Sequence, residues 1–468
     1  MRNRGEQTIC AISTPPGVGG VAVIRVSGPQ ALLICKKIAP GLTQKEIKSH
    51  QIYFTKIKDT ATGISGGETV DEVVVSYFAN GKSFTGEEVV EISCHGSEYV
   101  AEKIVDLLVD NGCKLAEKGE FTYRAFMNNK IDLVQAESVL SLIQSQNQAS
   151  ARVAVRQLQG YVSKQFEKLE SDLTWCLAHI EASIDFSTEG IDVVDPVVLI
   201  QKLKAIRVDL SALVSSYRSG RLVKDGIKVV LLGKPNVGKS SLLNIFSQDD
   251  KAIVTPVAGT TRDVIQATTL FDGFRFTISD TAGLRATEDL VEKIGVDRSQ
   301  KEAGKADVVL YVFDGTEPDW QIAKTQLSEV NSPVLILVNK TDLLSESQRA
   351  EFRKKLQNLS ANYQEQDIIF TSGLDPKSRD RVLTSVKTKI GQLNVLDEAM
   401  ITSARQYEMS RHALEMLDAS LQELEKNMGA EFIAMYLKDS LMSIQRILGH
   451  VFDDQIMDRV FKEFCIGK

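Results

Sequence analysis

The spacing of apolar residues divides the chain into stretches with different expected secondary structure. Over residues 1 to about 125, short β-rich runs alternate with turns. GGVAVIRVSG predicts one strand, and DEVVVSYFANGKSFTGEEVVEISCHG predicts two strands around the turn signal NGK. The run SEYVAEKIVDLLVDNGC has the helical period and ends at Gly112. This first part of the chain is therefore predicted to be α+β.

The apolar period becomes helical from about residue 131 to 218. Polar residues such as Lys164 and Lys168 fill the positions between the apolar ones. This pattern predicts an amphipathic helix, whose apolar face consists of Val162, Phe166, Leu169, Leu173, Leu177, Ile180 and Ile184. A second helix is predicted over 197–218, after the loop TEGIDVVDP.

A third pattern starts at residue 226, where strand, loop and helix repeat. The runs IKVVLLG, FRFTISD, ADVVLYVFD and PVLILVNK are almost continuously apolar, as expected of strands buried in a parallel sheet. After about residue 392 the helical period returns in HALEMLDASLQELE and FIAMYLKDSLMSIQRILGHVF. We infer that an α/β domain is inserted into a helical domain made of two segments.

These patterns predict a multidomain protein with α+β, helical and α/β parts, in which the inserted part is a doubly wound, mostly parallel sheet. The expected boundaries are 1–125 for the N-terminal domain, 126–225 for the first helical segment, 226–392 for the inserted domain and 393–468 for the second helical segment.

Composition narrows the class of protein. With 468 residues, 43% hydrophobic and 25% charged, the chain can build several cores. The net charge of −7 means that nucleic acid must be contacted through a local basic patch or a partner's charge. The six cysteines form no CxxC pair, which favours reduced thiols in the cytoplasm. The longest apolar runs are strand-sized, so no membrane span is expected.

A phosphate-binding loop is predicted at GKPNVGKS, residues 233–240. It follows the strand IKVVLL and opens the helix SSLLNIF, which is the context that this motif requires. Glycines let backbone N–H groups wrap phosphates, and the helix N-terminus adds positive potential. We expect Lys239 to reach the outer phosphates and the Ser240 hydroxyl to bind Mg²⁺.

Three further motifs follow in the order expected of a GTPase: DTAG at 280–283, NKTD at 339–342 and TSG at 371–373. The Asp342 carboxylate can accept from two guanine N–H donors that adenine does not offer together, which selects GTP. GTTRD supplies Thr261 as a second Mg²⁺ hydroxyl. This part of the chain resembles a translation-factor-type GTPase. GTP or GDP is expected to contact Asn236, Val237, Gly238, Lys239, Ser240, Ser241, Thr255, Pro256, Val257, Ala258, Gly259, Thr260, Asp280, Thr281, Ala282, Gly283, Asn339, Lys340, Asp342, Ser372, Gly373 and Leu374.

One position departs from the Ras-like pattern. Ras-like proteins place a glutamine after DTAG to orient the attacking water, and here that position is Leu284. Hydrolysis therefore needs another source of positive charge and another residue to orient the water. Asn236 can ligate a monovalent cation beside the phosphates. Glu292 is a candidate for the water-orienting carboxylate, although a solvated helix glutamate is the simpler interpretation from the sequence alone.

The chain ends in VFKEFCIGK, in which Cys465 is the fourth residue from the end. Three interpretations compete: a lipid attachment site, a frayed tail, and a tail folded into an active site. Prenylation needs a different last residue and an aliphatic pair, which CIGK lacks. The helix DQIMDRVFKEF carries apolar residues at helical spacing, so we expect it to hold the tail against the helical domain or a neighbouring subunit.

Over its whole length the chain resembles the MnmE (TrmE) family of tRNA-modification GTPases. The resemblance is carried by TPPGVGGVAVIRVSG, SFTGEEVVEISCHG, GEFTYRAFMNNKIDLVQAESV, GKPNVGKSSLLN, AGTTRDV and the terminal FCIGK. It implies an N-terminal domain that dimerises and binds tetrahydrofolate. It also implies a flavin partner, MnmG, which carries FAD, and a shared reaction that adds an aminomethyl-type group to C5 of the wobble uridine of tRNA.

The resemblance also assigns roles to individual residues. Glu292 becomes the water-orienting carboxylate, and Cys465 is expected to face the one-carbon group, as a reactive thiol or as a packing residue. The folate contacts fall on Arg25, Glu91, Lys130 and Lys468. The potassium site falls on Asn236, Thr255, Val257 and Thr260.

Two alternatives stay open at this point. The first is an Era-like GTPase switch in ribosome assembly, for which the FCIGK tail has no use. The second concerns His95, beside Cys94, which suggests a nucleophile but is better explained as a hydrogen-bonded structural histidine.

Overall fold

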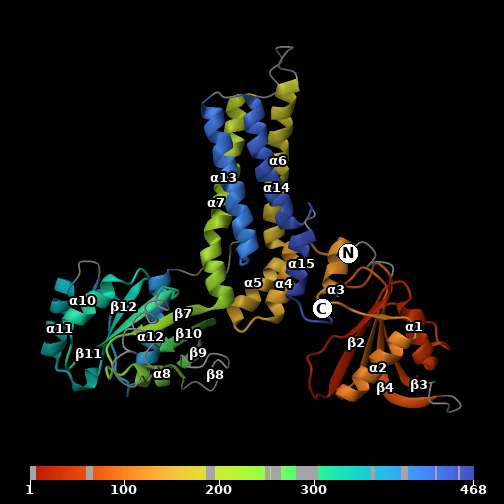
Figure 1. Cartoon of the computed structure of the whole chain (residues 1–468), viewed down its shortest axis with the longest axis horizontal. Coiled ribbons are helices and arrows are strands. Elements are labelled where there is room, and N and C mark those ends of the chain that lie inside the picture. The colour runs from red at the N-terminus through yellow and green to blue at the C-terminus, as the bar shows by residue number, and fades with distance from the viewer. Residues whose placement is uncertain are drawn as a thin grey trace, which may run out of the picture. The chain divides into compact units, whose positions relative to one another are not determined.

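The computed structural model shows two compact units (Figure 1). The first contains residues 1–140, 156–211 and 408–468, and the second contains 141–155 and 212–407. The structure describes residues 7–59, 67–185, 195–247, 253–254, 265–280, 304–359, 364–391, 399–426, 429–451 and 454–468.

A six-stranded sheet forms the N-terminal part of the first unit. Its order is β3-β4-β5-β2-β1-β6, and all neighbours are antiparallel except β1 and β6. Helices α1 and α2 cover one face, and Phe121 of α3 packs against Ile9 and Ala11 on the other. The predicted α+β domain is confirmed. Its elements are β1 (Ile9–Ile12), β2 (Val21–Ser27), α1 (Ala31–Ile38), η2 (Pro40–Leu42), β3 (Gln51–Asp59), β4 (Glu68–Phe78), β5 (Val89–His95), α2 (Glu98–Asp110), β6 (Lys114–Leu115) and α3 (Glu120–Met127).

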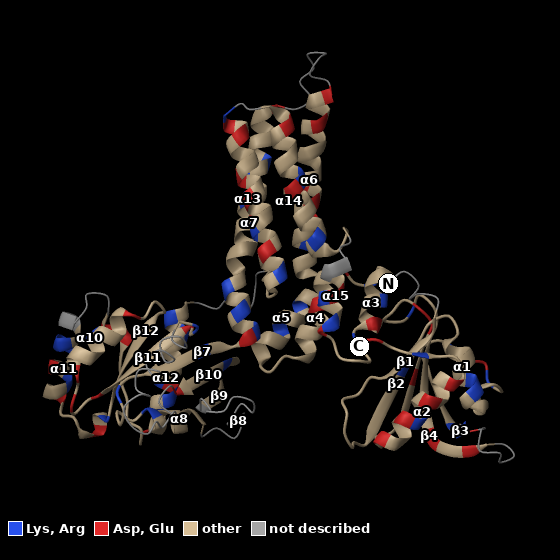
Figure 2. Cartoon of the chain, in the orientation of Figure 1, with Lys and Arg blue, Asp and Glu red and all other residues tan. Residues whose placement is uncertain are grey.

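The helical part is built from long helices, as the 3.6-residue period predicts. The buried residues Phe166, Leu173 and Ile180 form the expected apolar face of α6, which packs along α14. Figure 2 shows acidic and basic residues interleaved along α6, α13 and α14. The helices are α4 (Leu133–Ile143), α5 (Gln148–Leu158), α6 (Tyr161–Asp185), α7 (Pro196–Asp225), α13 (Ala404–Glu425), α14 (Ala430–Leu448) and α15 (Asp454–Lys462).

Helix α7 is longer than the sequence pattern predicts. It continues past residue 218 through Gly220, a residue that weakens helices in isolation. A Cβ at this glycine would lie 2.1 Å from the carbonyl oxygen of Ile401. The missing side chain lets the segment that returns from the α/β domain pack directly on the helix, and this tertiary contact offsets the weak propensity.

The second unit contains a seven-stranded sheet in the order β13-β12-β11-β7-β10-β9-β8. The strands are parallel except β9, which is antiparallel to β8 and β10. Because the sheet is mostly parallel and has helices on both faces, the predicted doubly wound fold is confirmed. The strands are β7 (Ile227–Leu232), β8 (Ile253–Val254), β9 (Ile265–Phe271), β10 (Phe274–Asp280), β11 (Val308–Asp314), β12 (Val334–Asn339) and β13 (Ile368–Phe370).

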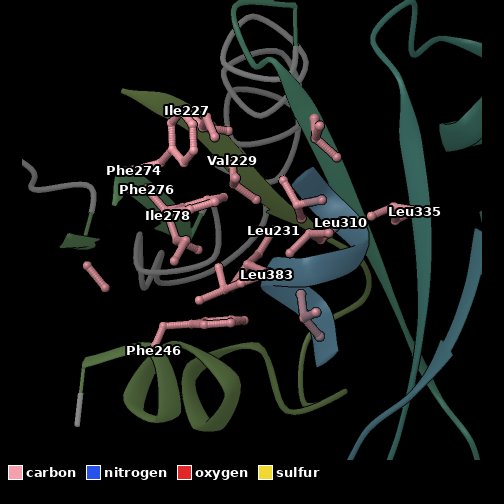
Figure 3. Close-up of a cluster of buried hydrophobic side chains, with 14 of the residues drawn as sticks. Ile227, Val229, Leu231, Phe246, Phe274, Phe276, Ile278, Leu310, Leu335 and Leu383 are labelled. Atoms are coloured by element: carbon pink, nitrogen blue, oxygen red, sulfur yellow. The ribbon is translucent and has the colours of Figure 1, made fainter. Parts of the chain in front are cut away.

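Helices cover this sheet on both faces. On one face, Phe246 of α8 and Leu383 of α12 pack against Val229, Leu231 and neighbouring strand residues (Figure 3). On the other face, α10 and α11 pack against the alternate residues of the same strands. No helix among the described residues is long and apolar enough to cross a membrane. The helices are α8 (Lys239–Ser247), α10 (Trp320–Ser328), η4 (Thr341–Leu343), α11 (Glu346–Leu359), η5 (Glu365–Asp367) and α12 (Lys377–Ile390).

Candidate functional site

The predicted phosphate-binding loop lies between β7 and α8. Positive φ angles at Gly233, Asn236 and Gly238 turn the backbone tightly before the helix begins. Lys239, the first residue of α8, is only 4% exposed. Its ammonium donates to the carbonyl oxygens of Gly233 at 2.6 Å and Lys234 at 2.5 Å. Burial lowers the pKa of Lys239, and the nearby Asp280 carboxylate opposes that shift. The ammonium is thus held inside the loop, where phosphates would bind.

A pair of oxygen ligands suited to Mg²⁺ lies beside this loop. The Ser240 hydroxyl donates to the Asp280 carboxylate at 3.3 Å, and Asp280 is 1% exposed at the end of β10. Hydroxyl and carboxylate oxygens are the ligands that Mg²⁺ prefers. The structure therefore brings together two residues that lie 40 positions apart in the sequence.

The motif predicted to select guanine, NKTD, lies against the predicted phosphate loop. The Asn339 side-chain amide donates to the carbonyl oxygen of Val237 at 2.8 Å, and its Oδ1 accepts no hydrogen bond from the described residues. The Asp342 side chain is exposed and forms no ion pair with them. Lys340 Nζ pairs with Asp314 at 2.6 Å. A buried acceptor without a partner and an open carboxylate suit a base that offers several N–H groups.

The closing loop TSG joins the same site. The backbone N–H and the hydroxyl of Thr341 donate to the carbonyl oxygen of Thr371 at 3.1 and 2.8 Å. A Cβ at Gly373 would lie 2.9 Å from the Cβ of Ser241 in α8. Ser372 is buried, and Leu374 is exposed. The phosphate loop, the NKTD motif and the TSG loop, which were predicted at three separate strand ends, thus meet at the carboxyl end of the sheet.

Several predicted residues lie outside the described part of the chain. They are the loop residues Thr255, Pro256, Val257, Ala258, Gly259, Thr260 and Thr261, the residues Thr281, Ala282, Gly283 and Leu284 after β10, and Glu292.

The N-terminal sheet carries two of the predicted folate residues as a pair. Arg25 on β2 is directly opposite Glu91 on β5. Its Nε and one terminal nitrogen both donate to Glu91 Oε1, at 2.9 and 2.8 Å. The second carboxylate oxygen of Glu91 accepts nothing from the described residues. Both side chains are partly exposed, so the pair presents a free carboxylate oxygen at the surface.

The last residues of the C-terminal tail lie against the N-terminal domain, whereas the prediction placed them against the helical domain or a neighbouring subunit. The preceding helix α15 contacts α4 of the helical segment as well as α3. Ser13 donates to the carbonyl oxygen of Gly467 at 3.1 Å, and the N–H of Gly119 donates to that of Cys465 at 3.4 Å. Phe461 of α15 makes an edge-on ring contact with Tyr123 of α3. Met457, Val460 and Phe461 of α15 are buried, together with Phe464 after it. They pack against Phe126 of α3 and against Leu133 and Ala136 of α4.

The remaining predicted residues are less closely grouped. Lys130 donates to the carbonyl oxygen of Gly81 at 3.1 Å, and Lys468 is half-buried. Cys94 is buried, and burial raises the pKa of its thiol to about 11, which makes it a poor nucleophile at neutral pH. His95 pairs with Asp71 at 2.7 Å, as expected for a hydrogen-bonded structural histidine. Cys465 is the exposed cysteine of the six.

Two contacts at these sites were not predicted. Ser13 holds the tail through its hydroxyl, and Asp314 holds Lys340. Nothing in the spacing of AISTPPG marks Ser13 as a partner of a residue 454 positions away. Asp314 ends an apolar strand, as Asp280 does, and that shared position was a usable signal.

Comparison with known proteins covers both units. Residues 8–130 match the model of the GTP-binding protein TrmE N-terminus, and residues 133–465 match that of the MnmE helical domain. A tRNA modification GTPase MnmE from Bdellovibrio bacteriovorus is 48% identical over 100% of this chain and 98% of the relative. The chain belongs to the MnmE family.

Other members of the MnmE family match equally completely. The tRNA modification GTPase MnmE of Flavobacterium johnsoniae is 36% identical over 99% of both chains. Among solved structures, the G domain of the T. maritima FeoB iron transporter aligns at 24% identity with a TM-score of 0.28, covering 36% of this chain and 99% of that one. The MnmE matches span the N-terminal sheet, the helices and the P-loop unit of this chain.

Proposed function

We propose that this protein is a potassium-dependent GTPase that works in the cytoplasm with the flavoprotein MnmG. The pair adds an aminomethyl or carboxymethylaminomethyl group to C5 of the wobble uridine of tRNA, using a tetrahydrofolate one-carbon unit. The observation that carries the proposal is the position of the CIGK tail. Gly467 of the tail contacts Ile12 and Ser13 at the end of β1, in the sheet that also bears the Arg25–Glu91 pair. The same chain has loops predicted to bind GTP.

The folate site is proposed at Arg25, Glu91, Lys130 and Lys468. The free carboxylate oxygen of Glu91 can accept from pterin N–H groups, and Arg25 can pair with an anionic glutamate tail. The tail brings Cys465 and Lys468 to the same domain. A bound folate supplies the one-carbon unit, and these residues would bind and orient it.

The GTP site is proposed to use the three loops that meet at the end of the sheet. Lys239 would contact the phosphates, Asp342 the guanine, and Ser240 with Thr261 the Mg²⁺ ion. The magnesium ion would neutralise phosphate charge. Glu292 would orient the attacking water.

We expect GTP turnover to be at least ~10-fold faster in KCl than in NaCl at equal ionic strength, a barrier difference of roughly 1.4 kcal/mol. Leu284 provides neither charge nor a polar group, so a cation held by Asn236, Thr255, Val257 and Thr260 would stabilise the developing phosphate charge. Steady-state phosphate release measures this directly. Equal rates in the two salts would contradict the potassium site.

Replacing Glu292 with alanine should lower kcat by roughly 100-fold while the affinity for GTP changes little. A group that orients water contributes only in the transition state, so binding of the ground state should be spared. Single-turnover hydrolysis and a separate titration with a fluorescent GTP analogue give the two quantities. A parallel fall in affinity would make Glu292 a structural residue.

The homodimer is proposed to form through the open face of the N-terminal sheet. Ile52 and Phe54 of the edge strand β3 are 72% and 60% exposed. The register places Ile52, Glu91 and Arg25 on one face of the sheet. An apolar patch beside the proposed folate residues would be covered by a second copy.

Phe54→Asp should weaken this dimer at least ~30-fold, because each copy loses a buried aromatic ring and gains a charge. Sedimentation velocity over a concentration series measures the effect. Leu33→Asp is the matched control, since Leu33 is 58% exposed but lies on α1, over the opposite face. Equal weakening by both substitutions, or by neither, would place the interface elsewhere.

Nucleoside analysis tests the function as a whole. We expect tRNA from cells that lack this chain to lose the modified wobble uridine, and expression of the chain to restore it only when MnmG is present. An Era-like switch would instead leave the uridine unchanged and disturb ribosomal subunit assembly. The tail on the N-terminal sheet favours the first outcome.

A further inference from the structure

A cavity lies along the outer strand β13 of the sheet in the second unit. It has a volume of about 640 Å³ and opens between α11 and α12. Strand β13 is the last in the sheet order, and α11 and α12 pack on opposite faces. The edge therefore lies open between two helices, in the part of the chain that the structure describes.

Strand β13 uses only one of its two sides for pairing. Its residues pair with β12 in parallel register, from Ile336 with Ile368 to Val338 with Phe370. The N–H of Thr371 donates to the carbonyl oxygen of Val338 at 2.8 Å. No other described strand pairs with β13. The N–H of Ile368 is used within the chain, because it donates to the carbonyl oxygen of Glu365, so the outer side offers mainly the N–H and C=O of Phe370 to another chain.

Three arginines surround this edge. Arg349 and Arg353 project from α11 and Arg381 from α12. The Arg353 guanidinium lies over the ring of Phe370, 4.9 Å from its centre. A planar guanidinium held in this way still has N–H groups free at its edge for a carboxylate.

The ion pairs of two of these arginines are loose. Arg353 is 3.9 Å from Glu365, and Arg349 is 3.5 Å from Glu346. Both glutamates are largely exposed, so such pairs contribute little and an incoming carboxylate can replace them. Arg381 pairs more tightly with Asp375, at 2.5 Å.

We propose that the β13 edge is a docking site for an extended acidic segment of a partner protein. The segment would add to the sheet as a further strand, and its carboxylates would pair with Arg349, Arg353 and Arg381. A nucleic acid is less suited to the site, because it has no peptide N–H and C=O groups that could pair with the outer side of β13. This proposal does not rest on the tRNA chemistry.

The site is connected to the guanine-binding loop. Arg349 donates to the carbonyl oxygen of Thr341 at 2.8 Å, and Thr341 in turn donates to that of Thr371, the residue after β13. A segment bound along β13 would restrict the motion of Thr371 and of the following residues Ser372 and Gly373, which form the closing loop. We therefore expect the bound segment to slow GDP release. By linkage, GDP must tighten binding of the segment by the factor by which the segment tightens binding of GDP.

The test uses the full-length protein loaded with GDP and three fluorescein-labelled probes of equal length. They are a peptide alternating Glu with Val, a peptide alternating Lys with Val, and a mixed-sequence single-stranded RNA. Fluorescence anisotropy at low salt should show that the Glu peptide binds with a Kd of roughly 10–100 µM. The Lys peptide should not bind. Arg353→Gln combined with Arg381→Gln should weaken the Glu peptide at least ~10-fold.

Lys324→Gln combined with Lys354→Gln removes the same charge from exposed lysines that do not line the cavity, and should leave the Glu peptide bound. The Glu peptide should also slow release of a fluorescent GDP analogue several-fold. The proposal would be overturned if both peptides bind equally, or if both double variants lose the Glu peptide equally. It would also be overturned if the RNA binds more tightly than the Glu peptide and the arginine double variant loses that RNA binding.

Discussion

Replacing Gly238 with alanine should lower the affinity for GTP and GDP at least ~100-fold, equivalent to roughly 3 kcal/mol. Gly238 has a φ of +95°, which an alanine adopts at a cost of about 1 kcal/mol. The new Cβ would also lie 2.1 Å from the Asn339 side-chain nitrogen. The predicted phosphate loop or Asn339 must move, and either shift separates groups that we propose to bind one nucleotide together. Titration with a fluorescent GDP analogue measures the loss.

Gly391→Ala is the matched control for backbone strain. Gly391 has a φ of +102° at the end of α12, and no atom of the described residues lies within 4 Å of its Cβ position. Gly391→Ala should lower the free energy of unfolding by about as much as the positive φ does in Gly238→Ala, and it should keep the affinity for nucleotide of the wild type. If both variants bind nucleotide normally, the contact between Gly238 and Asn339 does not shape the site. Far-UV circular dichroism should show that both variants remain folded.

Gly467→Ala should reduce tRNA modification at least ~100-fold and leave GTP hydrolysis unchanged. Gly467 has a φ of +90°, and its Cβ would lie 2.2 Å from the carbonyl oxygen of Ile12. The tail would have to leave its seat, and the Ser13 hydrogen bond to Gly467 would be lost. A misplacement of about 1 Å can cost ~100-fold in rate when reacting groups must be aligned. Quantifying modified wobble uridine in the purified two-protein reaction measures the effect.

The position of the tail can be followed independently of activity. Cys465 should react faster with a thiol reagent in Gly467→Ala than in the wild type, since the other five cysteines are buried. Gly17→Ala is the control, because its φ of +124° is also positive but its Cβ position is open. Cys465→Ser should abolish modification without moving the tail if the thiol takes part in the chemistry. Full modification in Gly467→Ala despite a faster thiol reaction would show that the tail seat is unrelated to catalysis.

The loops predicted to bind GTP are the part of the candidate site whose local structure follows most directly from the sequence. A phosphate loop needs glycines, a lysine and a helix start within eight residues, and guanine selection needs one short motif at a strand end. Each requirement is met by residues close together in the chain, so their spacing is informative. The same holds for α6, whose apolar period alone predicts an element observed over Tyr161–Asp185.

The surface on which the C-terminal tail packs could not be predicted from residue spacing. The period of α15 shows that the helix has an apolar face, but any surface of matching shape could cover it. The structure places that face on α3 and α4, and the following residues against Ile12 and Ser13. The pairing of Arg25 with Glu91 could not be predicted from residue spacing either, because it depends on β2 and β5 being neighbours in the sheet.

The sequence by itself determined where most strands and helices form, which loops are predicted to bind a nucleotide and which family the chain resembles. These properties depend on local backbone preference and short-range motifs. Only the tertiary structure decided that Gly238 meets Asn339, that α7 runs through Gly220 against Ile401, and that Gly467 reaches Ser13. Each of these contacts joins residues that are far apart in the chain. Its geometry is set by the packing of whole elements, which residue spacing does not encode.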